Sequence, residues 1–206
     1  MARYPTDRLT VHYANVALGC FAVFVLGVVL MHLLRSDVDV ASHKISDYAL
    51  GPWGGLMTTA FAGASLGCLM LALGFARSRP DSVAGWLAAA LFAIASVGLA
   101  VTAIYPTDMP GMPTTTAGGI HNVSFLVNVV SIVLAALLTA AIALRDARWR
   151  THRVPAALLA LLLVVAVVVQ FSALVRGMPY GTPNRFVIGV MMVWLVVTAM
   201  RLRRLG

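Results

Sequence analysis

The sequence contains no glutamate, and its acidic side chains are seven aspartates among 206 residues. Charged residues of all kinds make up 11% of the chain, whereas hydrophobic residues make up 61%. Soluble domains carry about 25% charged residues, so this composition excludes an ordinary soluble domain. It indicates an integral membrane protein whose charged side chains are confined to a few positions.

Cysteine is also scarce, and the compact motifs that identify common reactions are missing. Cys20 and Cys68 both fall inside apolar segments, which is typical of small buried residues and not of a disulfide or zinc framework. The sequence has no P-loop, no Gly-x-Ser-x-Gly elbow and no His-Glu-x-x-His motif. No pair of histidines lies at matched depth in the apolar segments, which argues against a haem held between helices.

The net charge of +8 raises the question of nucleic acid as a partner. The basic residues gather at the ends of apolar segments instead of forming one polar face, and this pattern is typical of anchoring to anionic lipid head groups. We therefore expect a membrane lipid or a lipid-soluble small molecule as the partner, and no nucleic acid. The oligomeric state does not follow from the sequence.

Six apolar stretches are long enough to cross a bilayer as helices, which takes about 20 residues each. They predict an all-α fold in which residues 1–206 form a single domain, a six-helix transmembrane bundle. The first stretch is too long for the apolar region of a signal peptide, so we expect a retained helix. The approximate helix bounds are residues 11–34, 53–76, 83–104, 120–144, 154–175 and 185–202.

Basic residues are distributed unequally between the two ends of this predicted bundle. One end carries eleven arginines, including Arg3 and Arg79, and the other end carries four basic residues. Because basic residues are enriched on the cytoplasmic side, we expect a multi-pass protein of the cell membrane with both termini in the cytoplasm. The outward connections would then be residues 35–52, 105–119 and 176–184.

The first outward connection contains an unusual concentration of chemistry in the stretch Ser46–Gly54. Asp39, His43 and Asp47 are spaced four apart, so a helical conformation here would place all three on one face. An acid beside an imidazole is a general acid/base pair and also half of a zinc site. The alternative is a solvated loop whose aspartate caps the next helix.

The third outward connection supplies a second acid and a second histidine. Pro106 ends the third helix and fixes the direction of the chain, so Asp108 would lie at a defined depth. His121 opens the fourth helix, and polar residues on the same helical face would point into the bundle or a wet cavity. Those residues are Ser124, Asn128 and Ser131. Hydrogen bonding between helices is the alternative role for the two serines.

The fifth outward connection brings Arg176 and Arg185 to the same side of the membrane. Either guanidinium could pair with Asp47 or Asp108, or hold an anionic head group. A structural ion pair that closes the outer end of the bundle is the alternative. Gln170 adds another polar side chain within the fifth apolar stretch.

Four short motifs in these regions carry a family resemblance. They are Ser46-Asp47-Tyr48-Ala49-Leu50-Gly51-Pro52-Trp53-Gly54, Tyr105-Pro106-Thr107-Asp108, Gly118-Gly119-Ile120-His121 and Gly181-Thr182-Pro183-Asn184-Arg185. Together, in this order, they resemble the membrane family catalogued as domain of unknown function 998. The resemblance implies a six-helix bacterial or archaeal membrane protein. It supplies no activity.

These patterns favour an intramembrane enzyme, a cyclase or lyase that acts on a lipid-soluble substrate from the outer half of the bilayer. Asp47 and Asp108 would do the acid/base work with His121, and protonation of an isoprenoid chain would drive its cyclisation, as in a terpene cyclase. Aromatic rings would stabilise the cation and polar groups would hold the substrate. The expected substrate contacts are Tyr48, Trp53, Tyr105, Phe125, Asn128, Arg176 and Arg185.

Other functions remain alternatives. A metal-assisted lipid hydrolase would bind a divalent metal through His43, Asp47, Asp108 and His121. The absence of a compact metal motif favours the reaction without a metal, so we expect no cofactor. A bundle that binds lipid or a partner without catalysis, with an Asp–Arg lid, and a small carrier are the remaining alternatives.

Overall fold

The computed structural model describes residues 7–78 and 82–205, and within these ranges it is helical without any strand. Six long helices follow one another along the chain, together with two short 3-10 helices, η1 (Ile45–Ala49) and η2 (Ala147–His152). All six are long and apolar enough to cross a membrane. They are α1 (Arg8–Leu34), α2 (Gly54–Ser78), α3 (Val83–Ile104), α4 (Thr116–Arg145), α5 (Arg153–Val175) and α6 (Gly181–Arg203).

The predicted six-helix bundle is therefore confirmed, and local chemistry explains where the helix bounds differ. Helix α4 begins four residues earlier than predicted because the Thr115 side chain accepts a hydrogen bond from the backbone of Gly118. Helix α6 also begins four residues early, at Gly181, whose N–H donates to the carbonyl of Ala41 at 2.8 Å. That bond attaches the start of α6 to the connection between α1 and α2.

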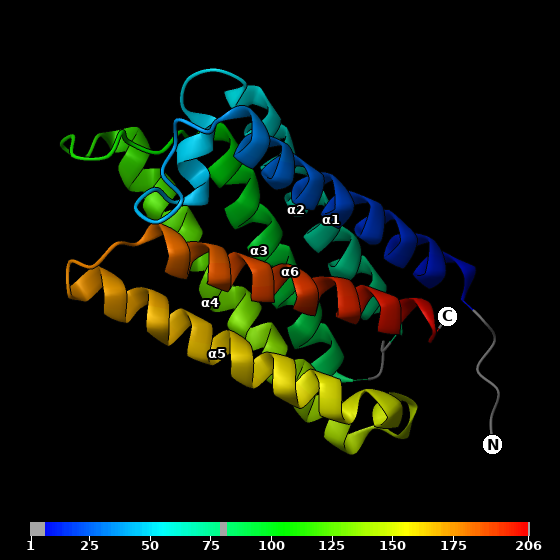
Figure 1. Cartoon of the computed structure of the whole chain (residues 1–206). Coiled ribbons are helices and arrows are strands. Elements are labelled where there is room, and N and C mark those ends of the chain that lie inside the picture. The colour runs from blue at the N-terminus through cyan, green and yellow to red at the C-terminus, as the bar shows by residue number, and fades with distance from the viewer. Residues whose placement is uncertain (1–6, 79–81, 206) are drawn as a thin grey trace.

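Neighbouring helices in the chain are neighbours in the bundle, and α1 also packs against α6 (Figure 1). Small residues line the buried face of α2, including Ala60, Ala64 and Gly67, which allows close approach of helices without large side chains between them. Aromatic rings fill wider spaces: Phe92 stacks on Trp194 with ring centroids 5.7 Å apart. The core therefore continues from helix to helix.

Three connections gather at one end of the bundle, the upper left in Figure 1: residues 35–53, 105–115 and 176–180. The start of α1 and the end of α6 lie at the opposite end (Figure 1). The polar connections singled out in the sequence thus share one end. Which end faces the cytoplasm stays a prediction from the basic residues, of which Arg3 and Arg79 lie outside the described residues.

Candidate functional site

A cavity of about 540 Å³ lies at the end of the bundle that carries these three connections. Its volume falls within the range of about 300–1,000 Å³ that is typical of small-molecule sites. Side chains from η1 and from all six helices or the connections between them line it. The deeper walls are apolar and hold Phe24, Phe61, Leu99, Phe125, Phe171, Met191 and Met192.

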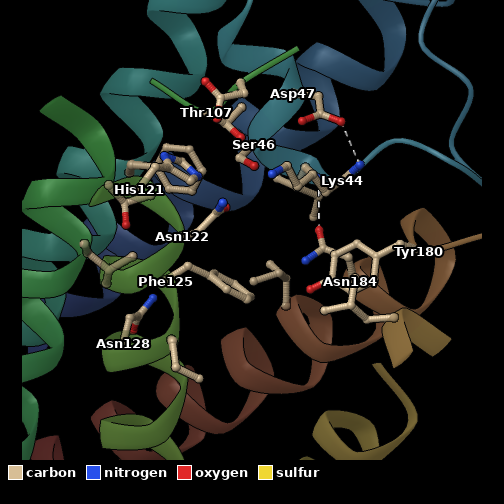
Figure 2. Close-up of a pocket in the computed structure, with 18 of the residues that line it drawn as sticks. Lys44, Ser46, Asp47, Thr107, His121, Asn122, Phe125, Asn128, Tyr180 and Asn184 are labelled. Carbon is tan, nitrogen blue, oxygen red and sulfur yellow. Dashed lines mark hydrogen bonds between the residues drawn. The ribbon is translucent and has the colours of Figure 1, made fainter. Parts of the chain in front are cut away.

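Polar side chains surround the part of this cavity nearest η1, and Figure 2 shows them converging from separate segments. Five residues predicted from the sequence line this one space: Asp47, Asp108, His121, Phe125 and Asn128. They come from η1, from the connection between α3 and α4, and from α4 itself. The tertiary structure therefore brings the predicted acids and histidine around a single cavity.

Asp47 is buried, with 5% of its surface exposed. Its Oδ2 accepts a hydrogen bond from the backbone N–H of Lys44 at 3.1 Å, whereas its Oδ1 has no partner among the described residues. Burial raises the pKa of the Asp47 carboxyl, and the nearby positive charge of Lys44 only partly opposes this effect. The residue thus combines the capping role with a raised pKa, so it keeps its proton to a higher pH than an exposed aspartate does.

Asp108 is held at the start of α4 by Thr115. Its Oδ1 accepts from the Thr115 hydroxyl at 2.6 Å and its Oδ2 from the Thr115 backbone N–H at 3.1 Å. The carboxylate lies so close to α4 that a Cβ on Gly118 would be 1.8 Å from Oδ2. An anion at a helix N-terminus is stabilised by the helix dipole. This geometry favours a structural role for Asp108 over the predicted acid/base role.

His121 is buried, and its Nδ1 donates to the carbonyl oxygen of Tyr105 at 2.9 Å. A carbonyl only accepts, so Nδ1 carries a proton. One turn further along α4, the hydroxyls of Ser124 and Thr102 are 2.8 Å apart, which supports the alternative role of interhelical bonding for Ser124. Asn128 lies below, 3% exposed, with no partner for its Oδ1 among the described residues.

Five predicted substrate contacts are not among the residues that line the cavity: Tyr48, Trp53, Tyr105, Arg176 and Arg185. Trp53 is 61% exposed and has a left-handed backbone with φ of 63°. Tyr105 contributes its carbonyl to His121 while its side chain is exposed. Arg176 is exposed beyond the end of α5. Proximity in sequence placed these residues near the site, but their side chains point elsewhere.

Arg185 organises the connection between α1 and α2 and is not among the residues that line the cavity. Its Nε donates to His32 Nε2 at 2.9 Å, its Nη1 to the carbonyl of Val40 at 2.9 Å, and its Nη2 to the Tyr48 hydroxyl at 3.2 Å. The guanidinium carbon also lies 5.6 Å from the centre of the Tyr48 ring. Tyr48 is fully buried beneath it.

The predicted Asp–Arg lid is not what closes this end. Within the described ranges, neither Asp47 nor Asp108 forms an ion pair with arginine. The ion pair at this end of the bundle is instead Arg35 with Asp37, at 2.8 Å, and Arg35 Nη1 also donates to the carbonyl of Leu50 at 2.7 Å. Arginine therefore closes the loop mainly by binding backbone carbonyls.

The polar residues that line the cavity and were not predicted include Lys44, Tyr180 and Asn184. Asn184 Oδ1 accepts from the backbone N–H of Ile45 at 2.9 Å, and Gln170 donates to the Tyr180 hydroxyl. Two features of the sequence could have indicated Asn184 and Lys44. Asn184 belongs to the motif at the start of the last helix, and Lys44 is the single lysine of the chain.

The predicted metal-ligand set does not assemble as four ligands. The His43 ring interacts with the Ser42 hydroxyl at 3.1 Å and is not part of the cavity lining. Among residues 7–78 and 82–205, no three histidine, cysteine or acidic side chains are grouped closely enough to hold a metal ion. The geometry thus gives no support to the metal-assisted alternative.

Comparison with known proteins gives one result. The model of a family described as "Protein of unknown function (DUF998)" matches residues 18–201. Neither the curated proteins nor the solved structures gave a match. The matched range contains every residue that lines the cavity.

Proposed function

Because the chain belongs to the DUF998 family, whose description names no activity, we propose a function from the site itself: binding of a lipid-soluble amphiphile in the cavity beneath η1. The apolar deep walls would hold the hydrocarbon part of the molecule, and the polar groups near η1 would hold its head. Burial of hydrocarbon contributes about 25 cal/mol per Å², so the walls favour such a ligand.

The observation that carries this proposal is the side opening of the cavity. Leu126 of α4 and Leu174 of α5 both line it, yet they are 46% and 53% exposed. The cavity therefore reaches the outer surface of the bundle between these two helices. In a membrane protein this surface faces lipid, so a hydrophobic molecule can enter from the bilayer without crossing water.

The excess of basic residues at the opposite end supports an orientation for this site. With both termini in the cytoplasm of a cell-membrane protein, the cavity would open in the outer half of the bilayer. We therefore propose that the ligand comes from the outer leaflet.

Asp47 supports a second proposal, that the bound molecule is also a substrate. A buried carboxyl with a raised pKa and an unpartnered oxygen is suited to donate a proton. Protonation of an isoprenoid alkene by Asp47 would start a cyclisation, and four phenylalanines that line the cavity would stabilise the cation. They are Phe24, Phe61, Phe125 and Phe171. Loss of a neighbouring C–H proton from the cyclic cation to the Asp47 carboxylate would give a cyclic alkene and restore the acid.

The binding proposal is tested with a neutral probe and a blocked cavity. Ile188 lines the cavity, whereas Val193 on the same helix is 52% exposed outside the cavity lining. We expect Ile188→Trp to weaken the binding of farnesol to the purified protein in nanodiscs at least tenfold, and Val193→Trp to leave it unchanged. Absence of farnesol binding to the wild type, or equal binding by both variants, would overturn the proposal.

The reaction is tested separately. Membranes that contain the wild type are incubated with linear isoprenoids, and cyclic products are sought by gas chromatography and mass spectrometry. We expect a product with the wild type and none with Asp47→Asn, although this variant should still bind farnesol. If the wild type gives no cyclic product, the proposed reaction is refuted, whereas the binding proposal is unaffected.

A further inference from the structure

Lys44 is the only lysine of the chain, beside fourteen arginines, and it lines the cavity. Figure 2 shows its side chain extending toward Asn122 and Ser46, into the space between η1 and α4. Among the described residues, its ammonium forms no ion pair and no hydrogen bond. A partly buried charge without a partner is unfavourable, so this site is suited to an anion from outside the chain.

The adjacent acid does not neutralise the Lys44 ammonium directly. Asp47 accepts the backbone N–H of Lys44, and the two side chains form no ion pair within the described chain. Burial also raises the pKa of Asp47, which favours the uncharged carboxyl. The positive charge at the rim of the cavity is therefore left for a ligand.

Asn184 adds a hydrogen-bond donor on the other side of the same space. Because its Oδ1 accepts from Ile45, its amide nitrogen is the group left for the cavity, and Figure 2 shows this nitrogen pointing toward the middle of the lined space. Asn184 is 4% exposed, so the amide is fixed in place. A cation and an N–H donor facing one space match the oxygens of a phosphate or carboxylate.

The arginines at this end of the bundle are not among the residues that line the cavity. Arg185 donates to backbone carbonyls and Tyr48, and Arg35 binds Asp37 and the Leu50 carbonyl. Arg176 is exposed and is not among the lining residues. Of the described basic residues, Lys44 is the one that the cavity presents.

We infer that Lys44 and Asn184 form a subsite for an anionic head group, so that the ligand of this cavity is an acidic amphiphile with a phosphate or carboxylate. The inference rests on the proposed function, because the apolar walls must hold the tail of the same molecule. It names the class of head group, which the binding proposal leaves open.

Two probes with the same tail test this inference: farnesol and farnesyl phosphate, bound to the full chain in nanodiscs of neutral lipid. We expect the wild type to bind farnesyl phosphate at least tenfold more tightly than farnesol. Lys44→Gln should lower the affinity for farnesyl phosphate much more than the affinity for farnesol and so remove this preference, and Lys44→Arg should retain most of it. Arg176→Gln is the matched control, since it removes a charge at the same end outside the cavity, and it should keep the full preference.

The outcomes separate the inference from the proposal on which it rests. If farnesol binds but farnesyl phosphate binds no more tightly, the subsite is refuted and the binding function stands. If neither probe binds, the proposed function fails. If inorganic phosphate alone competes as well as farnesyl phosphate, the site takes a free anion and the acidic amphiphile is refuted. If Lys44→Gln does not fold, the preference of the wild type for farnesyl phosphate over farnesol still tests whether the ligand carries an anionic head group.

Discussion

Asn184 in the first turn of α6 accepts a 2.9 Å hydrogen bond from the backbone N–H of Ile45, a residue 139 positions earlier in the chain. Both groups are buried, and the bond fixes η1 against α6. Since η1 carries Asp47 and directly follows Lys44, this contact helps to position one wall of the cavity, together with the bond from Gly181 to the Ala41 carbonyl. The candidate site therefore depends on the docking of a short loop helix onto the last helix.

Replacement of Asn184 by alanine should destabilise the protein. The buried Ile45 N–H would lose its acceptor, which costs about 1–3 kcal/mol. A lower midpoint of thermal unfolding in detergent is the expected result. Thr182→Ala is the control, because the Thr182 side chain is exposed in the same helical turn. Equal midpoints for Asn184→Ala and Thr182→Ala would show that the bond does not hold η1.

Arg185→Lys should loosen the connection between α1 and α2 while keeping the charge. A lysine cannot reach the Val40 carbonyl, the Tyr48 hydroxyl and His32 together, as the planar guanidinium does. We expect faster amide hydrogen exchange in residues 36–50 of this variant, measured by mass spectrometry. Arg176→Lys should leave the exchange unchanged, and a similar acceleration in both variants would contradict the bridging role.

Asp47→Asn should change how stability depends on pH. Burial raises the pKa of Asp47 above its ordinary value of 3.8, so the folded protein keeps this proton to a higher pH than the unfolded chain does. The free energy of unfolding therefore falls as pH rises from 3.8 through the raised pKa. We expect Asp47→Asn to remove this loss, giving a flatter profile of unfolding midpoint against pH and a higher midpoint at neutral pH.

Asp37 provides a control of opposite sign for that measurement. A hydrogen bond from Arg35 lowers the pKa of Asp37, so its contribution is present above its ordinary value of 3.8 and is lost as pH falls through the lowered pKa. Asp37→Asn should reduce stability at neutral pH, by a small amount because the Asp37 carboxylate is exposed. Parallel profiles of unfolding midpoint against pH for Asp47→Asn and the wild type would show that burial does not raise the pKa of Asp47.

Asp108 and Gly118 should be coupled in a double-mutant cycle. Asp108→Ala removes the contacts to Thr115 at the start of α4 and should cost about 0.5–2 kcal/mol. Gly118→Ala should also destabilise the protein, because the new Cβ would meet the Asp108 carboxylate. In the Asp108→Ala background the same substitution should become neutral or stabilising, as alanine favours helix. Additive effects in thermal unfolding would contradict this packing.

The six helices follow from the sequence alone. A bilayer leaves a segment of about 20 apolar residues no low-energy choice except a helix, because its backbone groups must be satisfied internally. The composition and the lengths of the apolar stretches therefore determined the fold class and the approximate helix bounds. The motifs at residues 46–54, 105–108 and 118–121 likewise indicated which connections carry the polar groups.

Only the tertiary structure decided which of those groups face the cavity. Sequence distance gives the position of a residue along the membrane normal but not the direction of its side chain, so Trp53 and Arg176 were expected at the site and lie outside its lining. Asp108 and Arg185 were predicted as site residues, and the structure joins Asp108 to Thr115 at the start of α4 and Arg185 to the Val40 carbonyl.

Lys44 is the opposite case, because the sequence did not indicate it as a site residue and the structure places it in the cavity lining. In the sequence it is one basic residue in a loop, and its charge entered only the count that gave the orientation. The hydrogen bond between η1 and α6 holds that loop over the end of the bundle, where Lys44 lines the cavity. Within the described residues, Lys44 has no ion-pair partner there. The hydrophobic pattern determined the bundle, whereas specific polar contacts between distant segments decided the site.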